Sequence, residues 1–558
     1  MTRRVLVIFI CFMIGWVAAL ANPAYPGKIT ISHKNGKQLV LTHRGDEHYS
    51  YFTDEEGNTY TRDDKGGFRE IGSDEVAQVW KARAAKAAAR RAARAAARTR
   101  GFGEPGNAIV GQKKGLVILV QFPDNHFVTP NAKAVFDDYF NKEFYSDYGM
   151  SGSVRDYFIE QSYGQLTIDF DVVGPYTTAH EMAYYGGHSD SGANDKNPGD
   201  MIKEVCRSAD GMVNFADYDW DHDGEVEQVY VIYAGYGENY DHSTNGKYAD
   251  TIWPHEWELE SATGSSIKLD GVVINTYACS SELRGTSGDV LSGIGPACHE
   301  FSHCLGLPDF YDLDGKHFGM SIWSVMDQGN YNNNSCTPAG YTSYERWFAG
   351  WLEPKEIKEM TTVKNMRPLS YSPEAYILYN ELDRNEFYLL ENRQLKGFDS
   401  ALYGHGLLVL HVNYNRNRWR NNTVNSYDSL QMMTIIPADG TLGSKLATDL
   451  AGDPFPGIQN NTALTNNTTP AAILYHDNLD GQKLMSKSIE DITENKLGWI
   501  SFVACRSESG AAAAGVASQV YKPDSSPLIY DLQGRCYGTD AGALKKGVYV
   551  IGGKKVIK

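Results

Sequence analysis

Beyond its first twenty residues, the sequence lacks any apolar run long enough to cross a bilayer, which excludes a protein with several membrane spans. Positive charge is also scarce. The 52 lysines and arginines stand against 69 aspartates and glutamates, and the formal net charge is −17. This balance argues against nucleic acid as a partner and suits an exported protein that holds calcium. With 42% hydrophobic residues, the 558 residues are enough for three or four domains of about 150 residues.

Cysteine is sparse as well, with eight residues in the chain, of which Cys11 lies in the apolar N-terminus. The other seven are an odd number, so at least one thiol is free or bound to another chain. None lies between residues 22 and 103, which excludes latency through a cysteine of that segment. Cys298 and Cys304 flank two histidines, but their spacing on a helix prevents both from joining the histidine face. We interpret them as packing or disulfide residues.

The N-terminus has the features of an export signal. Arg3 and Arg4 precede an apolar run over 5–20, and Ala19-Leu20-Ala21 offers small residues to a signal peptidase. We predict a secretory signal peptide cleaved after Ala21, and a secreted or cell-surface protein that meets membranes only through its export machinery. The alternative is an uncleaved anchor, which the short run and its small flanking residues disfavour.

The most informative pattern is His299-Glu300-Phe301-Ser302-His303. On a helix, the i, i+4 spacing puts both imidazoles on one face, where they can bind one Zn²⁺ at about 2.0–2.1 Å. Glu300 would lie beside the attacking water and accept its proton as general base. A bare H-E-x-x-H also arises by chance, so the residues around it decide its meaning.

Gly306 and Asp309 supply that context. Gly306 can adopt a positive φ and end the helix, which swings the chain back toward the metal. Asp309 lies three residues after Gly306, and for this reason we expect it, rather than Asp312 or Asp314, to be the third ligand. Three protein ligands leave the fourth position open for water, as in a catalytic zinc site.

The extended motif resembles that of the metzincin metalloproteases, and Ser324-Val325-Met326-Asp327 resembles their Met-turn, with Met326 beneath the metal. More closely, 299–312 and 323–329 resemble the M6 family of immune-inhibitor-A-like peptidases. Segments that support this likeness are 115–122, 152–157, 173–176, 184–186 and 253–255. The likeness covers about 110–430, with Ser302 in place of the commoner glycine. It implies an α/β zincin catalytic domain with a mixed sheet and a zinc-binding active-site helix, which hydrolyses peptide bonds of proteins.

Local patterns agree with this fold. Val117–Phe122 and Gln228–Tyr233 are predicted strands, and Val154–Gln161 is a predicted helix. In metzincins an edge strand ahead of the zinc helix pairs with extended substrate, and by resemblance we assign that strand to Val272–Asn275.

A small β-rich propeptide and a β-rich C-terminal domain are expected to flank the catalytic domain. The predicted segments are a signal peptide (1–21), the propeptide (22–80), an Ala/Arg-rich helical connector with cleavage sites (81–109), the catalytic domain (110–352), the β-rich domain (353–505), a flexible linker (506–526) and a terminal segment (527–558). The propeptide resembles that of M6-like proteins from Bacteroidetes bacteria. The terminal segment, through 528–535 and 547–551, resembles a type IX sorting tail; its alternative is a small hairpin.

Residues 82–98 are almost wholly alanine and arginine and have little to bury. We interpret them as an exposed connector that is cut by an Arg-specific protease or by the enzyme itself. Binding of nucleic acid or an anionic membrane by this run is the alternative. Within the propeptide, Gly45-Asp46 resembles the astacin-type switch, in which a carboxylate replaces the water on zinc. Asp46 could instead cap a turn while the propeptide merely covers the cleft.

A second acidic pattern offers hard oxygen ligands to Ca²⁺. Gly224 permits a sharp turn within it, but the twelfth position is Tyr230, so it is not a complete EF-hand. A solvated acidic turn is the alternative. The candidate ligands are Asp219, Asp221, Asp223, Glu225 and Glu227.

Two functional classes fit these observations. One is a secreted zinc endopeptidase made as a latent zymogen, and the other is a catalytically inactive surface binding or adhesion protein on a metzincin scaffold. The intact Glu300 favours the enzyme, since an inactive scaffold has no need of that base.

Overall fold

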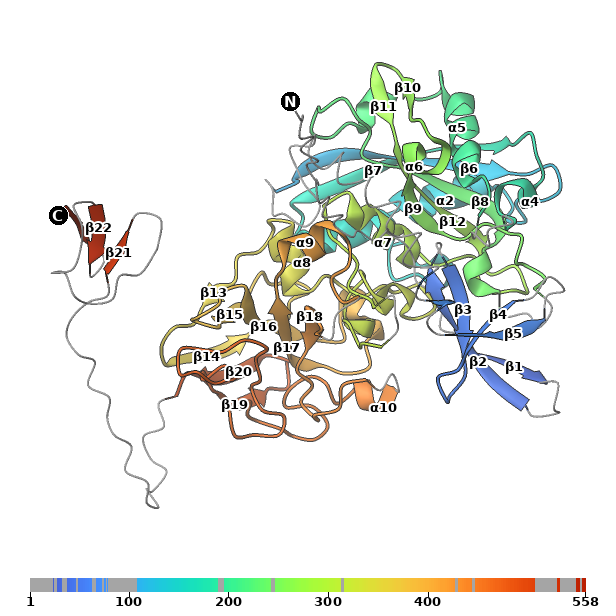
Figure 1. Cartoon of the computed structure of the whole chain (residues 1–558). Coiled ribbons are helices and arrows are strands. Elements are labelled where there is room, and N and C mark those ends of the chain that lie inside the picture. The colour runs from blue at the N-terminus through green and yellow to red at the C-terminus, as the bar shows by residue number, and fades with distance from the viewer. Residues whose placement is uncertain are drawn as a thin grey trace, which may run out of the picture. The chain divides into compact units, whose positions relative to one another are not determined.

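The apolar run Leu116–Val120 has no polar residue to face water, which is typical of a strand covered on both sides. In this computed structural model it lies within β6 (Gly111–Gln121), in a sheet of order β7-β6-β8-β12-β9. Strands β7 (Leu166–Thr177), β8 (Val229–Tyr236) and β12 (Thr276–Leu283) run parallel with β6, whereas the edge strand β9 (His255–Glu258) is antiparallel (Figure 1). The expected mixed α/β sheet is confirmed.

Alternate residues of β6 enter two different cores. Val117 and Leu119 pack on one face with residues of helices α2, α3 and α7, while Leu116 and Ile118 pack on the other with residues of α4, α5 and α6. Helix α3 coincides with the predicted helix. The helices are α2 (Ala132–Asn141), α3 (Val154–Gln161), α4 (Met182–Tyr185), α5 (Pro198–Ala209), α6 (Leu259–Thr263) and α7 (Gly295–His303).

The segment assigned to the substrate-binding edge strand does not join the main sheet, so that prediction was wrong. It forms β11 (Val272–Ile274), which pairs with β10 (Ile267–Leu269) in a separate hairpin. Val273 also exchanges backbone hydrogen bonds with the loop Gly224–Val226. The antiparallel edge position belongs to β9 instead.

The first strands form a separate five-stranded antiparallel sheet in chain order, with a small core of Ile29, Leu41, Phe52 and Tyr60. Its members are β1 (Lys28–Ser32), β2 (Gln38–Asp46), β3 (Tyr49–Thr53), β4 (Thr59–Arg62) and β5 (Phe68–Ile71). The latency candidate Asp46 ends β2, but its side chain lies outside the described residues.

The chain after residue 352 is β-rich and shares a core with the part before it. On β16, Phe387 and Leu389 pack with Val117 and Met326, while Tyr388 and Leu390 face a second small sheet. The first sheet has β13 (Lys355–Glu356), β15 (Tyr376–Tyr379), β16 (Glu386–Arg393), β17 (Gly406–Asn413) and β18 (Met433–Ile435); the second has β14 (Thr361–Met366), β20 (Ile500–Ala504) and β19 (Ile489–Glu494). Helices α8 (Ser343–Phe348), α9 (Arg416–Arg420) and α10 (Ala447–Leu450) complete this part.

The structure describes residues 24, 28–32, 38–46, 49–62, 67–72, 75–76, 78, 108–188, 195–241, 246–312, 316–426, 430–443, 447–506, 529–531, 548–551 and 554–557. The predicted signal peptide, nearly all of the connector, the linker and Asp314 lie outside these ranges. Residues 1–506 form one unit and 507–558 another. The second contains a three-stranded sheet of β21 (Ile529–Asp531), β22 (Val548–Ile551) and β23 (Lys554–Ile557).

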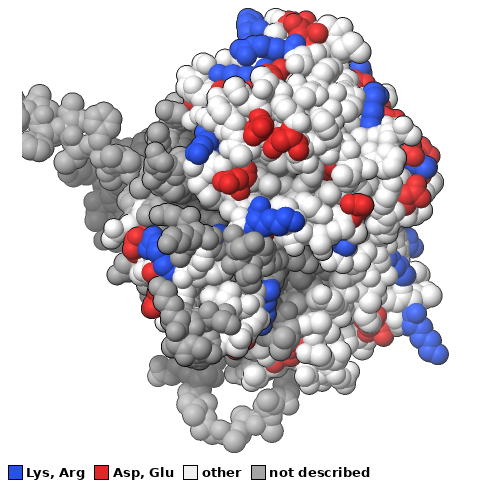
Figure 2. Space-filling model, turned by 90° about the vertical axis from the view of Figure 1, so that its right-hand side faces the viewer, with Lys and Arg blue, Asp and Glu red and all other residues white. Residues whose placement is uncertain are grey.

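None of the described helices combines the length and apolar character that a membrane crossing requires. On the face shown in Figure 2, acidic and basic side chains are interspersed among uncharged residues.

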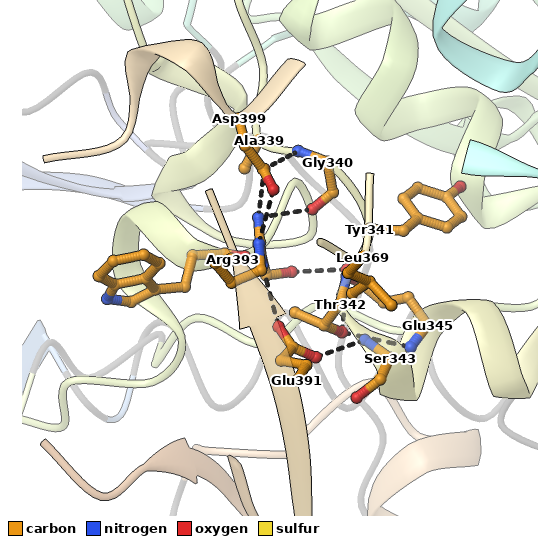
Figure 3. Close-up of polar contacts among 12 residues, drawn as sticks. Ala339, Gly340, Tyr341, Thr342, Ser343, Glu345, Leu369, Glu391, Arg393 and Asp399 are labelled. Atoms are coloured by element: carbon orange, nitrogen blue, oxygen red, sulfur yellow. Dashed lines mark hydrogen bonds and ion pairs between the residues drawn. The ribbon is translucent and has the colours of Figure 1, made fainter. Parts of the chain in front are cut away.

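A fully buried arginine joins β16 to the segments before it (Figure 3). Arg393 donates from Nε to Asp399 Oδ2 at 2.8 Å and from Nη1 to Glu391 Oε1 at 3.1 Å. Its remaining donors reach Asp399 Oδ1 and the backbone oxygens of Trp323 and Gly340. All five N–H groups of the guanidinium therefore have an acceptor. Burial alone would lower the pKa of Arg393, but the two carboxylates raise it, so it stays charged.

Replacing Arg393 by methionine should lower the free energy of unfolding by about 3–5 kcal/mol, because it leaves Glu391 and Asp399 as buried charges without a cation. Urea unfolding followed by tryptophan fluorescence measures this loss. The matched control is Arg384→Met, whose side chain is 48% exposed beside Glu356 and should cost about 0–1 kcal/mol. Equal losses in the two variants would contradict the role of Arg393.

Candidate metal centre

Helix α7 carries both histidines of the H-E-x-x-H motif one turn apart. Their ring centroids are 4.9 Å apart, and both side chains are buried. The helix ends at His303, and Gly306 follows with φ of 86° while its N–H donates to the oxygen of His303 at 2.8 Å. This left-handed turn, which glycine adopts readily, returns the chain toward the helix.

The turn brings Asp309 to the two imidazoles. Its Oδ1 lies 3.1 Å from Nε2 of His299 and 3.6 Å from Nε2 of His303. Ligands bound tetrahedrally at 2.0–2.1 Å would be about 3.3 Å apart. The two distances from Asp309 are close to this value, and all three donor atoms lie within 4.8 Å of one another. A single cation could therefore bind all three side chains. Asp312 lies elsewhere and accepts hydrogen bonds from the backbone N–H groups of Lys316 and His317.

Backbone oxygens set the orientation of both imidazoles. Nδ1 of His299 lies 2.8 Å from the oxygen of Val325, and Nδ1 of His303 lies 2.8 Å from the oxygen of Leu307. Because a carbonyl oxygen can only accept, each Nδ1 carries a proton, and Nε2 is the ring nitrogen that faces the centre. Val325 belongs to the Met-turn, so this turn positions a ligand directly.

A residue that the sequence did not point to orients Asp309, the third candidate ligand. Asn422 donates from Nδ2 to Oδ2 of Asp309 at 2.6 Å, and its Oδ1 accepts the Asp309 N–H at 2.6 Å. These two bonds leave Oδ1 of Asp309 facing the histidines. Asn422 follows α9, 113 residues after Asp309. Its only sequence signal is an Asn-Asn pair after a short helix, a combination that favours the left-handed conformation it adopts.

The electrostatics of the cluster favour a bound cation. Burial opposes a charged imidazole, but the hydrogen bond to Asp309 and the charge of Glu300 raise the pKa of His299 to about 9. Burial likewise opposes a charged carboxylate, but the imidazoles of His303 and His299 lower the pKa of Asp309. Without a metal, a proton on an imidazole offsets the buried carboxylate, and a divalent ion would take over this role.

The remaining motif residues have separate positions. Glu300 is fully buried next to His299, and its backbone oxygen accepts from Nε2 of Gln228 at 3.3 Å. Met326 is fully buried in the core after Val325. The Ser302 hydroxyl donates to the oxygen of Cys298 at 2.6 Å and contacts the Tyr341 hydroxyl, so its interactions are with the core.

The cysteines beside the motif form no disulfide within the described part of the chain. Cys298 is buried in the core, and the sulfur of Cys304 donates to Oε1 of Gln228 at 3.4 Å. Both therefore serve as packing residues. Cys206, Cys279, Cys336 and Cys505 likewise form no disulfide there.

The structure brings together only part of the second acidic group. Asp219, Asp221 and Glu227 place one carboxylate oxygen each within 4.8 Å of one another, without Asp223 and Glu225. Oε2 of Glu227 accepts the Trp220 N–H at 2.7 Å, and Asp223 accepts the N–H of Glu225 at 2.9 Å. This loop is the one that pairs with Val273.

The chain is similar to known peptidases. Residues 105–353 match the catalytic domain of the immune inhibitor A peptidase M6 family. The chain is 27% identical over 323 residues to the pre-pro-metalloprotease PrtV of Vibrio cholerae serotype O1 (strain M66-2). The aligned region covers 50% of this chain and 34% of that protein. It is also 27% identical over 284 residues to immune inhibitor A of Bacillus thuringiensis subsp. alesti. That aligned region covers 43% of this chain and 40% of the relative.

The matched part thus spans well under half the length of these relatives. The matched residues include α7, Asp309 and the segment predicted as the Met-turn. Residues 105–353 are therefore similar to immune inhibitor A-like peptidase M6 catalytic domains.

Proposed function

We propose that the protein is a secreted zinc-dependent endopeptidase, made as a latent zymogen, which hydrolyses peptide bonds of proteins with Glu300 as general base. The observation that carries the proposal is the buried group of His299, His303 and Asp309 on and after a helix that also bears Glu300. The metalloprotease named among the relatives supports a catalytic metal.

The choice of zinc follows from the donors and their surroundings. Two imidazoles and a carboxylate suit zinc, although the same set can also hold ferrous iron in oxygenases. Glu300, adjacent to the first ligand, is the residue that hydrolysis needs and oxygen chemistry does not. The match to the peptidase domain points the same way.

The residues of the chain divide the chemistry among them. Zinc, when bound, would polarise the substrate carbonyl and acidify water. Glu300 would accept the proton of the attacking water and deliver it to the leaving amine. The edge strand β9 would pair with an extended substrate chain, since β12 is its one strand partner among the described residues.

Latency and export complete the proposal. The N-terminal sheet β1–β5 would restrain the enzyme until the Ala/Arg-rich connector is cut by an Arg-specific protease or by the enzyme itself. Asp46 is the proposed carboxylate of a latency switch. We also propose a signal peptide over 1–21, a bacterial origin like that of M6 proteins from Bacteroidetes, and a type IX-like sorting role for 527–558.

Glu300→Ala should keep its metal and fold but lose proteolysis by a factor of about 10²–10⁴, because the attacking water loses its proton acceptor. Casein hydrolysis, with and without a chelator, and metal content measure the two properties on processed protein. His303→Ala should lose metal and activity together, and the exposed Glu359→Ala is the control. An active Glu300→Ala protein would overturn the assigned role.

Asn422→Ala should weaken zinc binding by about 10-fold to 100-fold without removing a ligand, because Asp309 would no longer be held by two hydrogen bonds. Competition with a chromophoric chelator measures this affinity. Asn417→Ala, an exposed asparagine on α9, is the matched control. Unchanged affinity in Asn422→Ala would show that Asp309 is positioned by other contacts.

Calcium should raise the melting temperature of the protein, because the loop of Asp219, Asp221 and Glu227 would bind it in the folded state only. Stabilisation of about 2.7 kcal/mol is expected at a calcium concentration of 100 times Kd. Asp219→Asn and Glu227→Gln should remove the calcium-dependent rise, while Asp147→Asn should keep it. The same rise in all variants would reject this loop as the site.

A further inference from the structure

A second cationic contact joins the N-terminal sheet to the catalytic domain. Arg62, the last residue of β4, places Nη2 3.1 Å from Oδ2 of Asp241 and 3.1 Å from its backbone oxygen. The side chain of Arg62 is only 16% exposed, and that of Asp241 is 2% exposed. The guanidinium also lies over the rings of Phe52 and Phe68, at 5.3 and 4.9 Å from their centroids. Arg62 is thus held between aromatic rings of its own sheet and a buried carboxylate.

Asp241 belongs to a buried acidic group. Glu238 is buried nearby, its Oε1 is 3.4 Å from His188, and its Oε2 has no hydrogen-bond partner in the described part of the chain. Burial and the carboxylates of Asp195 and Asp241 raise the pKa of Glu238, whereas Arg62 lowers it. A buried acidic group without a counter-charge is costly. Removal of the N-terminal sheet would therefore leave Glu238 and Asp241 ready to accept another cation.

These carboxylates lie beside elements of the active site. Glu238 starts the 3-10 helix η3 (Glu238–Tyr240), and its N–H donates to the oxygen of Ile252, just before β9. The next residue, Asn239, contacts the hydroxyl of Tyr331 at 3.4 Å, in the 3-10 helix η5 (Gln328–Tyr331) that follows the Met-turn. The group is therefore placed between the start of the edge strand and the segment that follows the Met-turn.

The N-terminal sheet makes another contact at the same place. His43 of β2 stacks on Phe52 and meets Trp253 edge-on, with ring centroids 5.4 Å apart. Trp253 lies two residues before β9. The sheet therefore contacts the approach to β9 through both His43 and Arg62.

We propose that Glu238 and Asp241, here called the Arg62 site, recognise an arginine side chain of the substrate, and that Arg62 occupies this site in the uncut chain. This inference rests on the proposed peptidase function. A chain paired with β9 would carry its side chains past the start of that strand, where the Arg62 site lies. The many arginines of residues 82–98 then make the connector of the same chain a fitting substrate.

A guanidinium suits the site better than a metal ion does. Nη2 of Arg62 is within hydrogen-bonding distance of both the carboxylate and the backbone oxygen of Asp241. The rigid, planar fork of guanidinium donors can serve both acceptors. Calcium would need six to eight oxygens around one point, and among the described residues Glu238, Asp241 and Asp195 do not bring one carboxylate oxygen each within 4.8 Å of one another.

Paired peptides test the substrate preference. The two peptides of a pair are identical except that one carries arginine and the other carries citrulline, its neutral isostere, at the same position. Successive pairs move this position along the residues around the cleaved bond. With processed protein, we expect kcat/KM to favour arginine by about 10-fold to 100-fold at one position. Asp241→Asn and Glu238→Gln should bring this ratio close to one, and the exposed Asp137→Asn should preserve it. A wild-type ratio near one, or a ratio unaffected by both variants, would overturn the proposal.

A second measurement needs no catalysis. In the full chain, Arg62→Ala should lower the melting temperature. Methylguanidinium at millimolar concentration should recover part of the lost melting temperature, and this recovery should level off as its concentration rises. The neutral N-methylurea should not, and Asp241→Asn added to Arg62→Ala should abolish the rescue. Equal effects of the two compounds, or rescue by Ca²⁺ alone, would overturn the Arg62 site. Selective rescue without cleavage of any peptide would instead contradict the peptidase function, and the substrate role of the site with it.

Discussion

The candidate metal centre depends on the buried guanidinium of Arg393, which lies on a strand far from helix α7 in sequence. Its hydrogen bonds to the oxygens of Trp323 and Gly340 hold the two ends of the segment that contains the Met-turn. Within that segment, the backbone oxygen of Val325 accepts a hydrogen bond from Nδ1 of His299. Because Arg393 on β16 donates to both ends of this segment, a displacement of β16 would strain these hydrogen bonds. The β-rich part after residue 352 therefore supports the candidate metal centre.

The sequence predicted the features whose causes are local. The candidate ligand group depends on an i, i+4 spacing and one glycine turn, all within eleven residues, so the spacing is enough to predict which residues come together. The central strand β6 was equally visible, because burial on both faces demands an unbroken apolar run. Asn422 was not visible, since its partner Asp309 is 113 residues away and no pattern links the two.

The edge strand shows a different limit of sequence reasoning. Val272–Ile274 is short, apolar and close to the zinc helix, yet Val273 bonds with the acidic loop rather than the main sheet. The true edge strand is His255-Glu256-Trp257-Glu258, whose charged residues give no strand signal. Among the described strands its four residues pair with β12 alone, and a partner on one side suffices for such an edge. Tertiary pairing therefore overrode local preference at both segments.

Buried carboxylates are offset in three ways in this molecule: by a permanent cation at Arg393, by the histidines or a metal at Asp309, and by a cation from the N-terminal sheet at Asp241. The order of these parts along the chain has a consequence for biosynthesis. A chain made from its N-terminus forms the sheet with Arg62 first, then the histidines, and only later Arg393 and Asn422. The proposed restraint would thus be present before the proposed hydrolytic centre is complete, which would protect the cell that makes the protein.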